Sequence, residues 1–446
     1  MARSAPTSPR RSTRRFPGWR SSRRTPLPSD CSRWRANRGN IVLPIGTNSP
    51  TTASTRNGLP IDLPISLRVM TSATTASPPM TELADPSRLR ILICCDAAIE
   101  RNGVGSYYGD LIEQIGPSVD TIELLAPGHG PEPLLSFPLP GDSTQQAALP
   151  AGWRLARVFD SLRPHVVIIA TPGPYGMTGA RLARRRGIPF IYGFHTHFEA
   201  LSELYWNRLM TAVATRYLES RNRKLFHRAA LTLAHSDSMV ELARRLGARR
   251  AELAATLLPG RFDRAPEPAT GPVRDILFVG RLAAEKRIDR LLDAAAKRPD
   301  LVFSFAGQGP LSETVASAAQ TRDNVRHLGW IERERIPRLL AEHDVLVLPS
   351  DVESFGTVAL EAIACARPAL VSTHCGIGEW PQLDEVLYRF DPDEPDAMIE
   401  ALDRLVALPE TQRRERANAG VAAYARIRDE GRQAWLETLL EVARAA

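Results

Sequence analysis

The sequence contains no apolar run of the roughly 18 residues that a transmembrane helix needs, and no apolar segment of a signal peptide is visible. It has five cysteines, an odd number, and two of them, Cys94 and Cys95, are adjacent in a short apolar run. That usage argues against a disulfide framework and for reduced thiols. No spacing typical of a metal site is present either. We therefore expect a cytoplasmic protein without a bound metal, either soluble or peripheral on the inner face of the cell membrane.

Acidic residues are nearly absent from residues 1–79, which contain 13 arginines, no lysine and only Asp30 and Asp62 in a background of Ser, Thr and Pro. This composition predicts a disordered extension. Three interpretations are open: a translated region upstream of a true start at Met80, a basic arm, or a transit peptide. Residues 80–446 hold 44 basic and 48 acidic residues, so the basic net charge belongs to the extension. The folded part therefore has no overall charge bias toward nucleic acid.

Short apolar runs alternate with helical patterns from Arg88 onward, and the alternation restarts after a proline-rich segment at 257–272. Near-continuous apolar strands separated by helices are typical of parallel sheets that are covered on both faces. The sequence therefore predicts an α/β fold with two doubly wound, Rossmann-like domains that face a central cleft. In such sheets ligands bind at the carboxyl ends of the strands. We expect an N-terminal domain at 86–262, a C-terminal domain at 272–425 and a separate amphipathic helix at 430–446.

The stretch DVESFGTVALEA, residues 351–362, has two glutamates eight positions apart with Gly356 between them. We expect a helix from Phe355 onward, with Glu353 in the preceding turn and Glu361 about two turns into the helix. The two carboxylates would then lie on the order of 12 Å apart, about the length of a sugar joined through a diphosphate to a ribose. A helix N-terminus favours a phosphate, and glycine leaves room for it. The alternative is a pair of surface glutamates that flank a helix start.

Two cations, Arg281 and Lys286, follow the predicted strand DILFVG. Lysine is rare here, with three residues against 54 arginines, and a guanidinium beside an ammonium suits a diphosphate. The alternative is a helix-capping arginine and a solvated lysine. In the N-terminal half, Gly103 and Gly105 resemble a dinucleotide fingerprint only loosely, because the third glycine is one position late. They fit a flexible loop beside phosphates and a generic tight turn equally well.

Two histidines, His195 and His197, end another predicted strand. A strand-end histidine that faces a cleft can contact a hydroxyl or a developing charge. A structural role is the alternative for each. Asp96, at the end of the first strand, is a weaker candidate of the same kind.

Several of these motifs together resemble a known family. GRLAAEK, GQGP, HLGWI and ESFGTVALEA, in this order, are similar to the donor half of the retaining family 4 glycosyltransferases, which have the glycosyltransferase B fold. The resemblance covers residues 88–446, and FHTHFEALSELYW is similar to the corresponding segment of members that glycosylate lipids. It implies a metal-independent hexosyltransferase without a cofactor, which moves a sugar from a UDP- or GDP-sugar to a hydroxyl of a lipid or glycan. The N-terminal domain would then be the acceptor side and the C-terminal domain the donor side.

The resemblance also implies roles for particular residues. Arg281 and Lys286 would neutralise the donor diphosphate, Glu353 would meet the sugar hydroxyls, Glu361 the ribose diol, and His195 the sugar near the reacting carbon. Further donor-binding residues are expected beside the phosphates and the base: Gly103, Gly105, Trp330, Ile331, Ser354, Phe355, Gly356 and Thr357. One departure from the family pattern is that Ala366 and Arg367 occupy a place where a glycine is common.

Residues 204–228 mix aromatic side chains with arginines and one lysine. A basic amphipathic helix of this kind can lie on an anionic membrane surface, and a solvated helix face is the alternative. Two other functions are open: a nucleotide-sugar epimerase of the same fold, and a non-catalytic protein that binds sugar nucleotides. Nucleic acid is not an expected partner.

Overall fold

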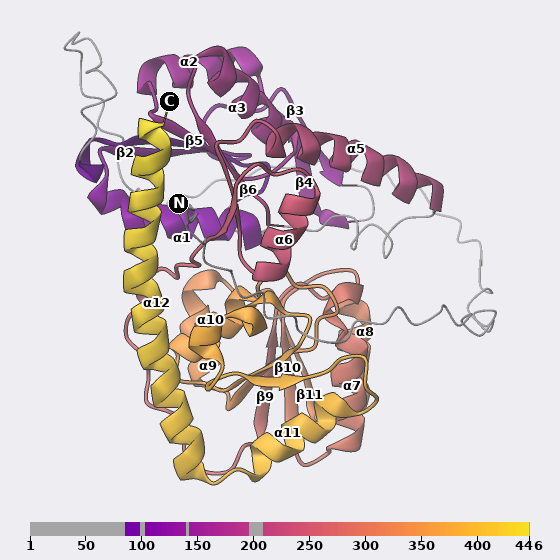
Figure 1. Cartoon of the computed structure of the whole chain (residues 1–446). Helices are drawn as coiled ribbons and strands as arrows, with labels where there is room; N and C mark the ends of the chain where they lie inside the picture. Colours follow the sequence, from indigo (N-terminus) through magenta and orange to yellow (C-terminus); the bar gives the residue numbers. More distant parts are fainter. Residues whose placement is uncertain (1–84, 99–102, 140–141, 196–207, 446) are drawn as a thin grey trace, which may run out of the picture. The chain divides into compact units, whose positions relative to one another are not determined.

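The computed structural model describes residues 85–98, 103–139, 142–195 and 208–445 (Figure 1). Residues 75–446 form one compact unit, which contains all of the described residues. The predicted extension at 1–79 and the candidate His197 lie outside them. None of the described helices is both long and apolar enough to pass through a bilayer.

The first lobe is built on a six-stranded sheet with the order β2-β1-β5-β6-β7-β8, in which all neighbours are parallel. The strands are β1 (Arg90–Cys94), β2 (Thr121–Leu125), β5 (Val166–Ile169), β6 (Phe190–Gly193), β7 (Leu231–Ala234) and β8 (Ala251–Leu253). The helices are α1 (Gly103–Ile115), α2 (Gly152–Leu162), α3 (Pro174–Arg185), α5 (Arg208–Phe226) and α6 (Asp237–Arg245). We call this part the N-terminal lobe. An antiparallel hairpin of β3 (Leu135–Leu139) and β4 (Asp142–Leu149) is inserted into it, which the sequence pattern did not predict.

Alternate residues of each central strand enter two different cores. Ile91 and Ile93 of β1 join a cluster on one side of the sheet, while Leu92 and Cys94 join a separate cluster. Successive side chains of a strand point to opposite faces, so both faces of this sheet are buried. This is why the strands read as continuous apolar runs rather than as alternating ones.

The second lobe repeats this plan with the strand order β11-β10-β9-β12-β13-β14, again all parallel. The strands are β9 (Asp275–Val279), β10 (Val302–Ala306), β11 (Val325–Gly329), β12 (Val345–Leu348), β13 (Ala369–Ser372) and β14 (Tyr388–Phe390). The helices are α7 (Ile288–Lys297), α8 (Ser312–Thr321), α9 (Ile336–Ala341), α10 (Thr357–Ala364) and α11 (Ala397–Ala407). We call this part the C-terminal lobe. Its strand order reverses direction between β9 and β12, which makes that pair the topological switch point.

The last element, α12 (Glu410–Arg444), is one continuous helix of 35 residues, drawn in yellow in Figure 1. The separate helix expected at 430–446 is therefore the end of a much longer one. Its first half packs on α10 and its second half on α1, and Trp435 is buried in a core of the N-terminal lobe. Two glycines permit close approach: a Cβ at Gly420 would lie 3.0 Å from a side-chain carbon of Ile363, and one at Gly431 only 2.6 Å from Cβ of Ala255. The helix thus contacts both lobes.

The predicted α/β class with two doubly wound, Rossmann-like domains is confirmed. Each lobe has a parallel sheet whose first strand is internal and whose order turns back beside that strand. In folds of this kind ligands bind at the carboxyl ends of the two strands that flank the reversal. In the C-terminal lobe these ends carry the residues that the sequence analysis selected.

Candidate active site

The loops that follow β9 and β12 contain the cations and the first glutamate. Arg281 comes two residues after β9, and Lys286 ends the short 3₁₀ helix η5 (Ala284–Lys286). Glu353 lies in the loop between β12 and α10. Because β9 and β12 pair directly, both loops leave the same edge of the sheet at the switch point. A backbone hydrogen bond of 2.9 Å from Asp351 N to the carbonyl of Glu285 joins them.

Lys286 and Glu353 form an ion pair across these loops. Their side chains are 18% and 21% exposed, so the pair is partly shielded from water while still reachable. Burial opposes the charged ammonium, but the Glu353 carboxylate and its hydrogen bond outweigh that effect, and the pKa of Lys286 is raised from its ordinary value. The ammonium is therefore positively charged at neutral pH and available to an anionic ligand. Arg281 lies beside it and bonds Glu285 at 3.2 Å.

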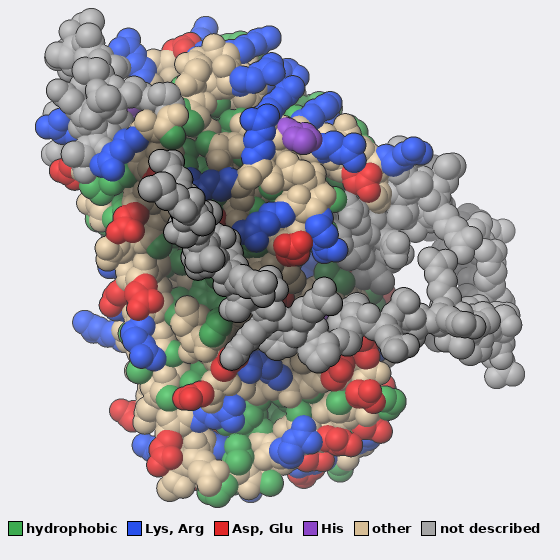
Figure 2. Space-filling view, viewed as in Figure 1, with side chains coloured by type: hydrophobic (Ala, Val, Ile, Leu, Met, Phe, Trp, Pro, Cys, Tyr) green, Lys and Arg blue, Asp and Glu red, His purple; other side chains and the backbone are tan. Residues whose placement is uncertain are grey.

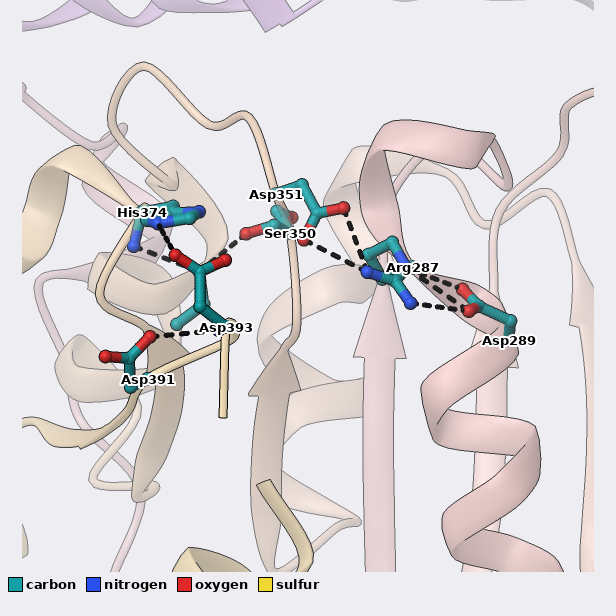
Figure 3. Close-up of polar contacts among 8 residues, drawn as sticks. Arg287, Asp289, Ser350, Asp351, His374, Asp391 and Asp393 are labelled. Atoms are coloured by element: carbon teal, nitrogen blue, oxygen red, sulfur yellow. Dashed lines mark hydrogen bonds and ion pairs between the residues drawn. The ribbon is translucent and has the colours of Figure 1, made fainter. Parts of the chain in front are cut away.

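Arg287 also joins the same two loops through its ion pairs with Asp289 and Asp351 (Figure 3). Its guanidinium lies between Asp289 on α7, at 2.8 Å, and Asp351 after β12, at 3.0 Å. Its backbone has φ of 48°, a left-handed conformation that costs a non-glycine residue roughly 1–2 kcal/mol. The two ion pairs hold the residue in this conformation directly next to Lys286.

The helix α10 begins two residues later than expected, at Thr357. Gly356 precedes it in a left-handed conformation, with φ of 97°, which favours glycine. Glu361 is consequently one turn into the helix and not two, and the expected 12 Å spacing does not apply because residues 353–356 are not helical. Gly356 nevertheless lies directly at a helix start, where the sequence predicts a phosphate.

Glu361 is buried, with 9% of its surface exposed, so it is not a surface glutamate. Burial raises its pKa to about 7, an effect that Arg333 partly offsets and Asp110 adds to. No described residue donates a hydrogen bond to its carboxylate. The nearby Arg333 instead forms two hydrogen bonds with Asp110 of α1, at 3.0 and 2.7 Å, and so joins the lobes. A buried carboxyl without a protein donor has the capacity to bind hydroxyl groups of a ligand.

The residues between Glu353 and α10 are fixed by the loop after β13. Gly376 N donates to the carbonyl of Glu353 at 3.0 Å, and Ile377 N donates to that of Phe355 at 2.7 Å. Phe355 is buried and packs on Trp380, with ring centroids 4.8 Å apart. The aromatic ring of Phe355 is therefore a core group. Ser354 and Thr357 are half-buried; Ser354 lies in the loop, and Thr357 is the first residue of α10.

His195, which follows β6, has both ring nitrogens bonded to protein. Its Nε2 lies 2.7 Å from the Tyr108 hydroxyl and its Nδ1 lies 2.8 Å from Nε2 of His235. Burial lowers the pKa of His195 well below its usual range, so the ring is neutral. His235 also contacts the C-terminal lobe: Trp380 Nε1 donates to its carbonyl at 2.8 Å, and its ring lies 6.1 Å from that of Phe355. His195 thus contacts His235, and the ring of His235 lies beside Phe355 of the 353–357 loop.

The remaining candidates of the N-terminal lobe have structural partners. Asp96 accepts hydrogen bonds from the backbone of Tyr175 and Gly176 at the start of α3, so it caps that helix. Gly103 and Gly105 form the first turn of α1 and not a loop ahead of it. A Cβ at Gly105 would lie 2.3 Å from the carbonyl oxygen of Ala98, so this glycine serves close backbone packing, whereas Gly103 has open space.

Trp330 and Ile331 follow β11, at the far edge of the same sheet. Trp330 is 49% exposed, and Ile331 packs partly on the core of the C-terminal lobe. Trp330 is thus the exposed aromatic ring of this pair, and Ile331 is half-buried.

The sequence did not point to four residues of this region: His235, Arg287 and the paired Asp110 and Arg333. His235 ends a predicted strand in the same way as His195 and could have been selected by that signal. The Asp110–Arg333 contact joins residues 223 positions apart, for which a single sequence carries no signal. Among the described residues, no group of three or more His, Cys, Asp or Glu side chains is placed to hold a metal ion.

The fold and this region define a two-lobed α/β protein with cationic loops at a topological switch point. Comparison with protein families gives a narrower assignment. Residues 101–255 match the model described as Glycosyltransferase Family 4, and residues 261–421 match the model described as Glycosyl transferases group 1. The chain therefore belongs to the family 4 glycosyltransferases and has the glycosyltransferase B fold.

Curated relatives match parts of the chain. It is 28% identical over 258 residues to the alpha-D-kanosaminyltransferase of Streptomyces kanamyceticus. The matched stretch covers 53% of this chain and 66% of that protein. It is 34% identical over 144 residues to the GDP-mannose-dependent alpha-(1-6)-phosphatidylinositol dimannoside mannosyltransferase of Mycobacterium tuberculosis, covering 31% of this chain and 37% of that protein. The matched stretches thus span between about a third and two thirds of these relatives.

Solved structures support the fold. Sucrose-phosphate synthase from Thermosynechococcus elongatus aligns with a TM-score of 0.63 at 16% identity, over 80% of this chain and all of that one. HepE from Anabaena, solved in complex with UDP, aligns with a TM-score of 0.57 at 14% identity, over 79% of this chain and 99% of that one. At this identity the likeness establishes the architecture alone.

Proposed function

We propose that this glycosyltransferase is a retaining, metal-independent hexosyltransferase that uses a UDP- or GDP-sugar and transfers the sugar to a hydroxyl of a membrane lipid or glycan. The observation that carries the proposal is the Lys286–Glu353 ion pair at the switch point, beside the start of α10. This pair combines a partly buried cation, which suits a diphosphate, with a carboxylate, which suits sugar hydroxyls. A relative named as a GDP-mannose-dependent mannosyltransferase and a fold neighbour solved with UDP motivate the choice of donors.

In the proposed reaction the bond between the anomeric carbon and the diphosphate oxygen breaks while the acceptor oxygen bonds to the same carbon, and the proton of the acceptor hydroxyl passes to the departing diphosphate. Negative charge builds on the departing diphosphate. Arg281, Lys286 and the N–H groups at the start of α10 would stabilise that charge, and the proposal needs no metal ion for it. Glu353 would orient the sugar through its hydroxyls, and Glu361 would bind the ribose diol. No protein cofactor takes part.

The test uses UDP-glucose and GDP-mannose with vesicles that contain diacylglycerol or phosphatidylinositol. The proposal expects release of nucleoside diphosphate that is faster with one acceptor lipid, and a product with the anomeric configuration of the donor. An epimerase would alter the sugar without releasing the nucleotide. A protein that only binds sugar nucleotides would do neither. Each of these two outcomes, or a product of inverted configuration, would contradict the proposal.

The unequal distribution of charged residues between the two halves of the chain supports an acceptor that lies at a membrane surface. Residues 80–262 contain 21 basic and 17 acidic residues, whereas residues 263–446 contain 23 basic and 31 acidic ones. Figure 2 shows Lys and Arg side chains gathered over the upper part of this face, around α5 and α6, with Asp and Glu more frequent over the lower part. On α5, Arg223 and Lys224 are exposed. Anionic lipid attracts such a surface by about 1 kcal/mol per basic residue.

Sedimentation with vesicles checks this part of the proposal. Reversing the charge of Arg223 and Lys224 to Glu should weaken co-sedimentation with phosphatidylglycerol vesicles severalfold at low salt. Arg338 on α9 offers a matched control, because its side chain is 80% exposed and lies on the acidic lobe. Equal binding of both variants would refute a role for α5 in membrane contact.

A further inference from the structure

Most of the large apolar side chains that are exposed in the described part of the chain lie in one region of the N-terminal lobe. Five of the eight such side chains are in or next to the β3–β4 hairpin and in the first turn of α2, with between 41% and 67% of their surface exposed: Leu134, Leu135, Phe137, Leu149 and Trp153. We call this group the hairpin patch. Single apolar side chains at a surface are ordinary, whereas a group of neighbours marks an interaction surface.

The pairing of the two strands places apolar side chains on one face of the hairpin. Leu135 lies opposite Leu149 and Phe137 lies opposite Ala147, and opposed residues of an antiparallel pair share a face. The intervening residue Ala148 belongs to the other face and is buried in a core of the N-terminal lobe. The hairpin therefore packs through one face and presents Leu135, Phe137 and Leu149 on the other.

Trp153 lies at the base of the hairpin, between two arginines. The next residue, Arg154, donates a hydrogen bond of 3.1 Å to the carbonyl of Glu132, two residues before Leu134. The guanidinium groups of Arg154 and Arg157 lie over the Trp153 ring, 5.0 and 4.8 Å from its centroid. Cation–π attraction thus holds two positive charges against the apolar ring.

Arginine dominates the charge of the segments around the hairpin patch. Residues 131–186 contain seven arginines, no lysine and three acidic residues. One of the acidic side chains, Asp160, is bonded by Arg186 at 2.7 Å. Helix α3, in the upper part of Figure 1, packs on both α2 and β4. Its three arginines are exposed: Arg181, Arg184 and Arg185. The hairpin patch therefore lies beside an excess of positive charge.

This charge selects among the occupants that could cover the hairpin patch. A second copy of the chain would bring the same arginines to the contact, and the extension at 1–79 would bring 13 more, so like charges would meet. An anionic membrane offers the opposite charge, and its acyl region accepts apolar side chains without pockets shaped for them. Tryptophan and arginine suit the headgroup level, because each has an apolar body and a polar end.

We propose that the hairpin patch inserts into the interfacial region of an anionic lipid membrane. Leu135, Phe137 and Leu149 enter the acyl region, while Arg154 and Arg157 meet the lipid phosphates. The inference goes beyond the proposed function, because the patch shares no residue with the donor site or with α5. The contact proposed for α5 attracts the membrane by charge, whereas the hairpin patch adds the burial of apolar surface.

Fluorescence quenching tests this insertion directly. The full chain is mixed with vesicles of phosphatidylcholine and phosphatidylglycerol whose acyl chains are brominated, and its emission is compared with that in vesicles without bromine. Trp153→Phe isolates the emission of Trp153 from that of the other tryptophans, of which the chain has seven in all. We expect a quenched component in the wild type that Trp153→Phe lacks. Equal quenching of the two proteins overturns the proposal.

Sedimentation with the unbrominated vesicles gives a second readout. The double variant Leu135→Ser/Phe137→Ser should bind about tenfold more weakly or less at both about 0.1 M and about 1 M salt, since the burial of apolar surface is not screened. Arg223→Glu/Lys224→Glu should weaken binding only at the lower salt concentration. Leu253→Ser is the control, because Leu253 is 44% exposed on β8 and lies outside the patch. Wild-type binding by the hairpin variant at both salt concentrations overturns the proposal.

Sedimentation equilibrium without lipid tests the second copy as the occupant. We expect the wild type and Leu135→Ser/Phe137→Ser to have the same oligomeric state. An oligomer that only the wild type forms, with equal vesicle binding by both proteins, shows that a second copy covers the patch and overturns the proposal. None of these assays contains a sugar nucleotide. An absence of transferase activity would therefore refute the proposed function and leave the membrane result standing.

Discussion

The buried Glu361 gives a prediction in which stability and ligand binding change in opposite directions. Its ordinary pKa of 4.5 is raised to about 7 in the folded protein. The folded state therefore binds more protons than the unfolded state between these values. The stabilising contribution of the neutral carboxyl is fully present below pH 4.5 and is lost as the pH rises through about 7. The shift in the pKa of Glu361 corresponds to at most about 3 kcal/mol in the free energy of unfolding.

Glu361→Gln removes the cost of burying an ionised carboxylate at high pH, because the amide has nearly the same shape and no charge. We expect the variant to match wild type near pH 5 and to melt several degrees higher at pH 8. Arg333 does not cancel the effect, since both of its bonding nitrogens are directed at Asp110. Thermal unfolding of both proteins at several pH values provides the assay. Glu400→Gln, an exposed change on α11, should show no pH-dependent difference from wild type.

Ligand binding should change in the other direction. If Glu361 binds the ribose diol, the rise in melting temperature caused by saturating UDP or GDP should shrink in Glu361→Gln, corresponding to roughly tenfold weaker binding. The reasoning about burial is refuted if the ligand-free variant is no more stable than wild type at pH 8. An unchanged ligand effect would instead reject the ribose contact alone.

Three other predictions concern the loops around Lys286. Alanine at Lys286 or Glu353 should lower turnover about 100-fold or more, measured as nucleotide release under saturating donor; near-wild-type rates in both variants would exclude this pair from the site. Gly376→Ala should cost about 1–3 kcal/mol in unfolding assays and also slow turnover, because its Cβ would lie 2.1 Å from the carbonyl oxygen of Ser354; equal stability would show that the loop can move aside. Arg287→Ala should cost about 1 kcal/mol or less, as expected for partly exposed ion pairs, while the donor KM rises severalfold; an unchanged KM would show that Lys286 is held without it.

The sequence predicted the parts of the fold that depend on local pattern. The apolar runs became parallel strands because both faces of each sheet are covered, and the glycine at 356 precedes a helix in the left-handed conformation that it permits. Ala366, noted where the family commonly has glycine, indeed has φ of 53°. Helix ends were less predictable: α10 starts two residues late, and α12 extends twenty residues further toward the N-terminus than its amphipathic end suggested. Propensity alone does not fix such ends, which depend on packing.

What the sequence by itself determined is the chemistry of the candidate site: a cationic loop after one strand and a glutamate loop after another, in an order that resembles a transferase family. Strand pairing was needed to place these loops side by side, since β9 and β12 are neighbours only through the doubly wound order of the sheet. Burial decided the rest. It makes Glu361 a carboxyl of unusual pKa and gives His195, a lone strand-end residue in the sequence, hydrogen bonds to Tyr108 and His235, because each depends on partners far away in the chain that only folding brings into contact.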